Sequence, residues 1–454
     1  MTRQQMADQA RTYHILTFGC QMNVCDSNWL SQALEARGWR AAPEGAAEVI
    51  LINTCSVREK PEQKVYSLLG RLASLRQDAL VVGVGGCVAQ QVGTGFWERF
   101  PQVRLVFGTD NVSLVPDSLE QVLEDPGLRI SLLDFMDHYP ERDNVWRDGP
   151  QPAQAFVNIM QGCDNFCTYC IVPHTRGRQK SRRSPAVLQE CRDLVQAGVK
   201  EITLLGQNVN SYGQDRFGDG VSFPQLVHRV CSIPGLERVR FTTSHPKDID
   251  LELIEAFGRY ANLCPSLHLP LQSGSNRILK RMGRRVSREA YLDTISRLRE
   301  VCPDIVISTD LIVGFPGEDE SDFQATLASM AEVGFDSSYS FKYSDRPGVK
   351  AADYPDKIDE ETKSRRLLEL QAHQARLTEA SLNRLVGRDV DVLVEGSSAR
   401  QNGQEPCWKG REPGGRLVNF SWSGGQDLTG TLVRVHIDQA KKHSVRGEVK
   451  KGYG

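Results

Sequence analysis

The stretch AFVNIMQGCDNFCTYC, residues 155–170, joins a short apolar strand directly to a loop with three cysteines. Cys163, Cys167 and Cys170 have CxxxCxxC spacing, so their thiolates can hold three corners of a cubane iron–sulfur cluster. The fourth iron would lack a protein ligand and could bind a substrate or cofactor. Two alternatives stay open: a Cys3His zinc site completed by His174, or three core thiols that are close together by chance.

The strand before this loop is the first of six that alternate with helical patterns up to about residue 345. The clearest of these helices begins at Ser184-Pro185. This alternation predicts a partial (β/α)6 TIM-like barrel with its chemistry at the carboxyl ends of the strands. The expected strands are Ala155–Met160, Glu201–Leu205, Arg238–Thr242, Ser266–Leu269, Asp304–Leu311 and Phe335–Phe341.

The N-terminal region has the same alternation. Tyr13–Phe18, Glu48–Asn53 and Ala79–Val84 are expected strands, and Asp26–Arg37 and Arg58–Arg76 are expected helices. The pattern predicts a doubly wound parallel sheet.

A second cysteine set follows these three N-terminal strands. Cys20, Cys55 and Cys87 are separated by 55 − 20 = 35 and 87 − 55 = 32 residues, about one βαβ unit each. Because neighbouring parallel strands end at the same edge of a sheet, the three sulfurs are expected to converge on a second cluster; buried core thiols are the alternative. The remaining six cysteines are expected to be incidental: Cys25, Cys191, Cys231, Cys264, Cys302 and Cys407.

The C-terminal region changes character after a charged helix at Asp359–Leu385. Glycine-rich short strands follow, which is typical of a small antiparallel β-barrel. They are Asp389–Glu395, Arg416–Phe420, Thr431–Asp438 and Ser444–Lys450. The chain is therefore expected to divide into an N-terminal α/β domain (11–145), a central barrel (150–383) and a C-terminal barrel (384–450).

Composition narrows the setting. The 454 residues carry a formal net charge of -2, which argues against a polybasic, histone-like protein but not against a local basic groove. No run of about 18 apolar residues and no secretory leader is evident, so we expect a cytoplasmic protein without membrane association. In a reducing compartment, twelve cysteines are expected to bind metal or do chemistry rather than form a disulfide framework.

Eight motifs occur together in this chain: TFGCQMNVCDS, INTCSVREKPEQKV, GGCVAQ, MQGCDNFCTYCIVPHTRGR, LLGQNVNSY, TTSHP, HLPLQSGSNRILKRMGR and STDLIVGFPGE. CxxxCxxC resembles the signature of radical S-adenosylmethionine enzymes, and the set resembles the methylthiotransferase family over nearly the whole chain. GCQMN (19–23) and GQNVNSY (206–212) are closer to the tRNA-modifying, MiaB-type branch than to the branch that modifies a ribosomal protein. The C-terminal segment is similar to a TRAM domain. Gln179 and Arg183 depart from the Glu and Pro that are more usual in the family.

The resemblance implies two [4Fe–4S] clusters, a radical cluster on Cys163, Cys167 and Cys170 and an auxiliary one on Cys20, Cys55 and Cys87. Their open irons are expected to face each other across one chamber. S-adenosylmethionine would yield a 5′-deoxyadenosyl radical, and a second molecule would supply the methyl group. The implied reaction is methylthiolation of C2 of N6-isopentenyladenosine at tRNA position 37.

Three alternatives stay open: modification of N6-threonylcarbamoyladenosine 37, modification of an aspartate of a small-subunit ribosomal protein, and a non-catalytic iron–sulfur or zinc RNA-binding regulator. The expected partners are the tRNA anticodon loop, an electron donor such as flavodoxin or ferredoxin, and a sulfur donor of unknown identity. We expect a monomer.

Polar residues at the strand ends are candidates for holding the cofactor, although such residues are also common turn caps. They are Tyr169, Gly206, Gln207, Asn208, Ser244, Gln272 and Ser308.

Cations beside the radical loop are candidates for pairing with RNA phosphates, with a solvated surface as the alternative. They are Arg176, Arg178, Lys180, Arg182 and Arg183, five in eight residues. Lys441 and Lys442 of the C-terminal barrel are also expected to bind RNA. Trp408, Phe420 and Trp422 are expected either to stack on loop bases or to fill the barrel core.

Overall fold

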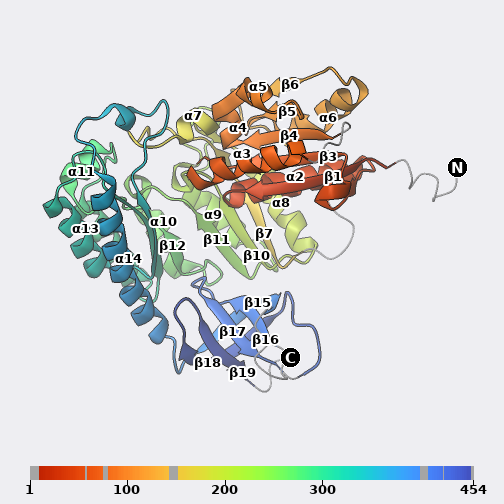
Figure 1. Ribbon diagram of the computed structural model, residues 1–454. Coiled ribbons are helices and arrows are strands. Elements are labelled where there is room, and N and C mark those ends of the chain that lie inside the picture. The colour runs from red at the N-terminus through yellow and green to blue at the C-terminus, as the bar shows by residue number, and fades with distance from the viewer. Residues whose placement is uncertain are drawn as a thin grey trace.

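The computed structural model describes residues 10–56, 59–74, 80–142, 152–398, 407–422 and 424–450. Its N-terminal part is a six-stranded sheet in the order β2-β1-β3-β4-β5-β6, and every pairing is parallel. The strands are β1 (Thr12–Phe18), β2 (Arg40–Ala41), β3 (Val49–Thr54), β4 (Val81–Gly86), β5 (Val103–Phe107) and β6 (Ile130–Leu132). Figure 1 shows this sheet and its helices in red to orange.

Helices cover both faces of this sheet, which confirms the predicted doubly wound domain. Leu30 and Leu119 pack on one face, and Val65 and Phe96 pack on the other. The central strand β3 is buried at all six positions, as expected for a strand covered on both faces. The helices are α2 (Gln21–Ala36), α3 (Glu59–Ser74), α4 (Cys87–Val92), α5 (Phe96–Arg99) and α6 (Val115–Glu124).

The predicted start of α2, at Asp26, is wrong. The helix begins at Gln21, with Cys20 as its N-cap. Its first turn lacks an apolar stripe, yet Met22 and Asn23 are both buried against neighbouring parts of the fold. Strands β2, β5 and β6 of this sheet were not predicted.

The central part is the expected partial barrel. Two parallel three-stranded sheets, β11-β10-β7 and β12-β13-β14, are joined by a bridge between Val239 and Leu263. Ile202 and Leu204 of β10 point to the outer helices, whereas Thr203 points inward. The strands are β7 (Gln154–Asn158), β10 (Glu201–Leu205), β11 (Arg238–Thr242), β12 (Ser266–His268), β13 (Val306–Val313) and β14 (Ser337–Lys342).

Seven helices of the described chain accompany this barrel, and the last runs down to the C-terminal part (Figure 1). They are α8 (Ser184–Gln196), α9 (Phe223–Cys231), α10 (Leu251–Arg259), α11 (Asn276–Arg281), α12 (Arg288–Val301), α13 (Glu320–Val333) and α14 (Glu360–Asn383). A small hairpin of β8 (Met160–Gln161) and β9 (Lys180–Ser181) encloses α7 (Val172–Arg176).

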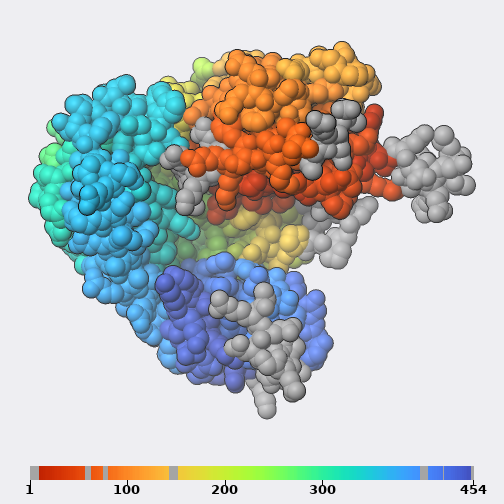
Figure 2. Space-filling view, viewed as in Figure 1, coloured from red at the N-terminus to blue at the C-terminus, as the bar shows by residue number. Residues whose placement is uncertain are grey.

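The C-terminal part is a closed five-stranded barrel in the order β15-β16-β17-β19-β18, a separate lobe in Figure 2. The prediction of a wholly antiparallel barrel is wrong in one place: β17 and β19 pair in parallel, since β19 returns antiparallel beside β18 to close the barrel. Phe420 is buried in its core, and Trp408 and Trp422 pack against that core. The strands are β15 (Asp389–Ser397), β16 (Cys407–Arg411), β17 (Leu417–Ser421), β18 (Leu432–Ala440) and β19 (Val445–Val449).

The C-terminal barrel is attached at the amino ends of the central strands. Arg238, the first residue of β11, donates hydrogen bonds to the carbonyls of Arg411 and Asp391 at 2.8 and 2.9 Å. Arg240 donates to the carbonyl of Glu412 at 3.1 Å and to the Glu201 carboxylate at 3.1 Å. The N-terminal part contacts the opposite, carboxyl end.

Among the helices that the structure describes, none combines the length and apolar character needed to cross a membrane.

Candidate active site

Three cysteines stand at neighbouring strand ends of the N-terminal sheet. Phe18 pairs with Thr54, and Thr54 pairs with Gly86, so β1, β3 and β4 end side by side. One or two residues beyond these ends come Cys20, Cys55 and Cys87. The Cys55 thiol lies within hydrogen-bonding reach of the other two thiols. The three sulfurs therefore converge, and we call them the auxiliary trio.

Local packing holds the auxiliary trio together. The Asn23 amide donates to Asn53 Oδ1 at 2.8 Å and to the Thr54 carbonyl at 3.0 Å, which ties the first turn of α2 to the end of β3. Gly86 has a φ of +85°, and a Cβ there would lie 2.3 Å from the Thr54 carbonyl oxygen. Only glycine fits this close turn into Cys87.

The auxiliary thiols are prepared to act as thiolate ligands. Hydrogen bonding from Cys55 lowers the pKa of Cys20 to about 5 and the pKa of Cys87 to about 6. The shared proton remains with Cys55, whose pKa is raised by the two neighbouring thiols. The positive charge of Arg176 further lowers the pKa values of Cys20 and Cys87. Iron is bound by thiolates, so this state suits a cluster.

The second trio lies in the loop between β8 and β9, and we call Cys163, Cys167 and Cys170 the radical trio. Cys163 N–H donates to the Gly177 carbonyl at 3.3 Å, and Cys170 N–H donates to the Cys167 carbonyl at 3.0 Å. Thr168 pins the loop to α11 through the Met282 carbonyl at 2.9 Å. The loop is therefore fixed by backbone contacts.

Burial raises the pKa of Cys170 to about 12 and also raises the pKa of Cys163. A buried arginine, Arg284, lies beside these thiols with its Nη1 3.9 Å from Cys167 Sγ. Its charge lowers the pKa of Cys170 in opposition to burial. These thiols thus favour ionisation only when a cation replaces their protons.

Buried polar atoms without partners mark the carboxyl ends of the barrel strands. Within the described residues, Asn208 Oδ1, Ser244 Oγ and His245 Nε2 have no hydrogen-bond partner, and neither does Arg284 Nε. Buried polar atoms are normally satisfied, so these four fit a polar ligand such as an amino-acid-containing cofactor. Asn208 and Ser244 are among the predicted cofactor residues.

The other predicted cofactor residues have varied surroundings. Gln207 uses its amide within the protein, since Oε1 accepts from Gly162 N–H at 2.6 Å and Nε2 contacts Met22 Sδ. Gly206 is needed for packing, because a Cβ there would lie 2.4 Å from Met160 Cγ. Tyr169 packs on the small core formed with Ile278, Met282, Phe315, Tyr343 and Ala351.

Gln272 and Ser308 lie near further polar groups on β12 and β13. Gln272 is buried with a left-handed φ of +74°, and its N–H donates to the Asp310 carbonyl at 2.8 Å. Ser308 Oγ shares a 3.0 Å hydrogen bond with His268 Nδ1, and His268 Nε2 lies 3.5 Å from Asp310 Oδ2. Sequence reasoning missed His268 and Asp310, although their inward-facing positions on β12 and β13 were predictable from strand alternation.

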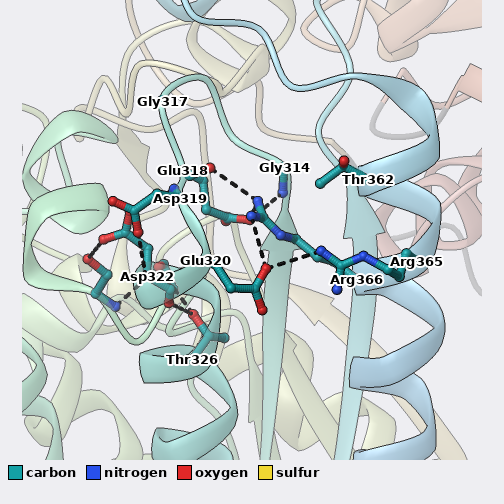
Figure 3. Close-up of polar contacts among 12 residues, drawn as sticks. Gly314, Gly317, Glu318, Asp319, Glu320, Asp322, Thr326, Thr362, Arg365 and Arg366 are labelled. Atoms are coloured by element: carbon teal, nitrogen blue, oxygen red, sulfur yellow. Dashed lines mark hydrogen bonds and ion pairs between the residues drawn. The ribbon is translucent and has the colours of Figure 1, made fainter.

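The loop that follows β13 is held by a buried ion pair (Figure 3). Glu318 accepts from the Gly314 N–H at 2.8 Å and from Arg366 of α14 at 2.9 Å. Gly314 has a φ of +70°. The VGFPGE loop is therefore shaped by α14, and its backbone is fixed at the carboxyl end of β13.

The buried His245 side chain should make the free energy of unfolding depend on pH. Burial lowers the pKa of this imidazole to about 2, so only the unfolded chain takes up its proton as the pH falls through about 6.5. The free energy of unfolding should therefore fall by about 1.4 kcal/mol between about pH 7.5 and pH 5.5 through this group. Chemical denaturation of wild type and His245→Gln checks this, and equal pH slopes for the two proteins would contradict it.

Three of the cations that were predicted to bind RNA are instead buried, so that prediction is wrong for them. Arg176, Lys180 and Arg182 are 3%, 2% and 7% exposed. Lys180 pairs with the buried Asp110 of the N-terminal part. Arg182 pairs with Glu141 at 2.9 Å and with Glu190. These charges hold the parts of the chain together.

The remaining predicted RNA residues lie on the surface. The Arg178 side chain is 73% exposed, pairs with Asp164 at 2.7 Å and lies over the exposed Phe166 ring at 5.0 Å. Arg183 is exposed at the N-cap of α8. Lys441 and Lys442 are exposed in the turn between β18 and β19.

In the zinc alternative, His174 would be the fourth ligand of the radical trio. His174 is exposed on α7. In the part of the chain that the structure describes, no three His, Cys, Asp or Glu side chains form a site for a single metal ion. The donor sets are two all-thiol trios, which fit clusters ligated at separate corners.

Comparison with known proteins adds to this picture. Residues 157–330 match the Radical SAM superfamily model, and residues 12–108 match Uncharacterized protein family UPF0004. A tRNA-2-methylthio-N(6)-dimethylallyladenosine synthase of Nitratidesulfovibrio vulgaris is 58% identical over 440 residues, covering 96% of this chain and 98% of that protein. The chain belongs to the tRNA-2-methylthio-N(6)-dimethylallyladenosine synthase family.

Other members of this synthase family agree over the same length. The Lawsonia intracellularis synthase is 49% identical over 451 residues, and the Geotalea uraniireducens synthase is 44% identical over 456 residues. They cover 96% and 99% of this chain and 98% and 100% of their own lengths. Among solved structures, the radical S-adenosylmethionine methyltransferase TsrM from Kitasatospora setae, with cobalamin and a [4Fe-4S] cluster bound, matches with a TM-score of 0.55 at 13% identity. That match covers 76% of this chain and 74% of TsrM, and it shows the fold alone.

Gln179 departs from the glutamate that we expected in this synthase family, and the structure gives it a local partner. Its amide Nε2 donates to the Ser211 carbonyl at 2.7 Å, and its Oε1 accepts from Ser211 Oγ at 2.7 Å. A carboxylate could make only the second contact. Gln179 thereby ties β9 to the turn after β10.

Proposed function

We propose that this chain methylthiolates C2 of N6-isopentenyladenosine at position 37 of tRNA, next to the anticodon. The observation that carries the proposal is the contact of Arg176, on the helix that follows the radical trio, with Met22, two residues after Cys20 of the auxiliary trio. Full-length relatives named tRNA-2-methylthio-N(6)-dimethylallyladenosine synthase support the substrate. Two [4Fe–4S] clusters and S-adenosylmethionine are the cofactors, in keeping with the radical SAM family match.

In this proposal each trio holds one cluster. Cys163, Cys167 and Cys170 hold the radical cluster, and Cys20, Cys55 and Cys87 hold the auxiliary one. When bound, these clusters and S-adenosylmethionine supply an electron, a carbon-centred radical, a methyl group and a sulfur site. The C2–H bond of adenine is strong and weakly acidic, so a radical suits it better than a general base.

The chain's own residues bind and orient the reactants. Asn208 and Ser244 offer buried, unpartnered polar atoms to the methionine part of the cofactor. His245 stays neutral at physiological pH because its pKa is lowered to about 2 by burial, so its free Nε2 does not add a second charge beside Arg284. Tyr169 and the backbone of the VGFPGE loop are the groups that we assign to the adenosine part.

The substrate adenine has to leave its stack to reach this end of the barrel. Arg178 with Phe166, Arg183, and Lys441 with Lys442 are the exposed groups that we assign to tRNA contact. An exposed guanidinium over an aromatic ring suits phosphate pairing and base stacking.

We place the enzyme in the cytoplasm as a monomer. We divide the chain into domains at 11–145, 150–383 and 384–450, and we assign flavodoxin or ferredoxin as the electron donor.

The decisive experiment compares three substrates. Anaerobically reconstituted enzyme is incubated with S-adenosylmethionine, a reductant and sulfide, and with one substrate at a time: tRNA bearing N6-isopentenyladenosine 37, tRNA bearing N6-threonylcarbamoyladenosine 37, or a ribosomal-protein peptide with the target aspartate. Mass analysis of nucleosides and peptides should find a methylthio product only with the first. Product with either of the others alone would replace the proposed substrate, and RNA binding without 5′-deoxyadenosine formation would point to a regulator.

Lys441→Ala/Lys442→Ala should weaken tRNA binding in a salt-dependent way. Each lost phosphate contact removes about 0.7–0.9 from the slope of log affinity against log salt, so the slope should fall by about 1.5. Filter binding or anisotropy at several salt concentrations measures it. Arg259→Ala, an exposed cation on α10, is the matched control. An unchanged slope in the double variant would remove the two lysines from the interface.

A further inference from the structure

Arg176 is a buried cation beside the auxiliary trio. It is the last residue of α7, which follows the radical loop, and it is 3% exposed. Its Nη1 lies 3.6 Å from Met22 Sδ, two residues after Cys20. It therefore reaches from the radical loop into the N-terminal sheet.

The guanidinium is only partly satisfied there. Its helix α7 contacts α4, which begins at Cys87, yet Nη2 makes no hydrogen bond within the described residues. Ser56, directly after Cys55, is also buried, and its hydroxyl has no partner in the same part of the chain. A buried charge with a free N–H is costly unless an anion meets it.

Two other arginines in the same basic stretch, Arg178 and Arg182, both have acidic partners. Arg178 is exposed and paired with Asp164, and Arg182 is buried but paired with Glu141 and Glu190. These two arginines thus pair with carboxylates of the protein itself. Within the described residues, no carboxylate accepts a hydrogen bond from Nη2 of Arg176.

We propose that Arg176 binds the sulfur reactant of the reaction: its Nη2–H donates to a soft sulfur anion, sulfide or methanethiolate, held at the auxiliary trio. This inference rests on the proposed function. The forked guanidinium keeps Nη1 on Met22 and leaves Nη2 for the ligand. A lysine ammonium has no such fork.

The test uses the full chain reconstituted with both clusters, and methanethiolate as the probe. The reduced auxiliary cluster is followed by electron paramagnetic resonance while methanethiolate is added to wild type, Arg176→Gln and Arg176→Lys. A charge-assisted hydrogen bond contributes enough that its loss should weaken binding about ten- to one hundred-fold in Arg176→Gln. Arg176→Lys should recover only part of this. Arg259→Gln, an exposed cation on α10, should bind methanethiolate as tightly as wild type.

Iron and sulfide content decide how a weaker response is interpreted. Full iron with weakened methanethiolate binding in Arg176→Gln supports the site. Equal affinity in wild type and Arg176→Gln overturns it, and so does loss of auxiliary iron in both Arg176 variants, which would make the arginine a structural support. Failure of the proposed function appears separately, as wild type that binds methanethiolate but leaves tRNA unmodified.

Discussion

Replacing Cys20, Cys55 and Cys87 together with alanine should remove about half of the iron and sulfide from anaerobically purified protein. Each cubane needs its own thiolates, and the radical trio is untouched by these substitutions. The variant should still cleave S-adenosylmethionine to 5′-deoxyadenosine under reducing conditions, but it should form no methylthiolated nucleoside. Iron analysis, cofactor cleavage and nucleoside mass analysis give the three readouts.

The mirror variant, with alanine at Cys163, Cys167 and Cys170, should also lose about half of the iron, but should lose cofactor cleavage as well. Together the two variants distinguish a protein with two clusters of different function from a protein with one cluster shared by both trios. If either triple substitution removed all of the iron while the protein stayed folded, the assignment of two independent trios would be wrong. Cys302→Ala, at the C-cap of α12, serves as the control and should keep its full iron content.

Lys180→Met should destabilise the contact between the N-terminal part and the radical loop by about 3–5 kcal/mol, because it leaves the buried Asp110 carboxylate without its cation. Backbone amides of β8, β9 and the loop at Thr109 should then exchange with solvent about two to four powers of ten faster. Native-state hydrogen exchange measures this local opening. The salt dependence of tRNA binding should not change, since Lys180 is inside the protein.

A compensating variant tests the cause. In Lys180→Met/Asp110→Asn the carboxamide oxygen can still accept from the Met136 N–H, which donates to Asp110 at 2.8 Å. Removing both charges should restore most of the exchange protection, because a buried ion pair and its neutral replacement are often close in stability. Protection as low in the double variant as in Lys180→Met would show that the lysine acts through packing.

The two cysteine trios were predictable because their positions depend on chain order and strand direction. Glu201–Leu205 and Arg238–Thr242 were predicted with their observed bounds. Neighbouring parallel strands with one connection each must end at one edge, so the convergence of Cys20, Cys55 and Cys87 followed from spacing alone. The start of α2 was not predictable in this way, since its first turn is buried by contacts with distant segments.

The roles of the basic run could not be deduced from sequence for a related reason. Arg176, Arg178 and Lys180 alternate in burial, and what decides each is a partner far away in the chain. Asp110 reaches Lys180 across 70 residues, and Met22 reaches Arg176 across 154. The number of cations in a short stretch of sequence does not reveal these distant partners. The inward-facing positions of His268 and Asp310, in contrast, could have been predicted from the alternation of side chains along their strands.

The attachment of the C-terminal barrel has a consequence for how its role can be studied. This small barrel is the floor of the central one: Arg238 and Arg240 reach down to its backbone carbonyls, and a Cβ at Gly414 would meet Val306 at 2.5 Å. Cutting the chain after residue 383 would strip those acceptors from two guanidinium groups and uncover apolar surface beneath the strands. A truncated enzyme would therefore lose the structural support of its central barrel as well as any RNA contact. Only surface substitutions can separate these two effects.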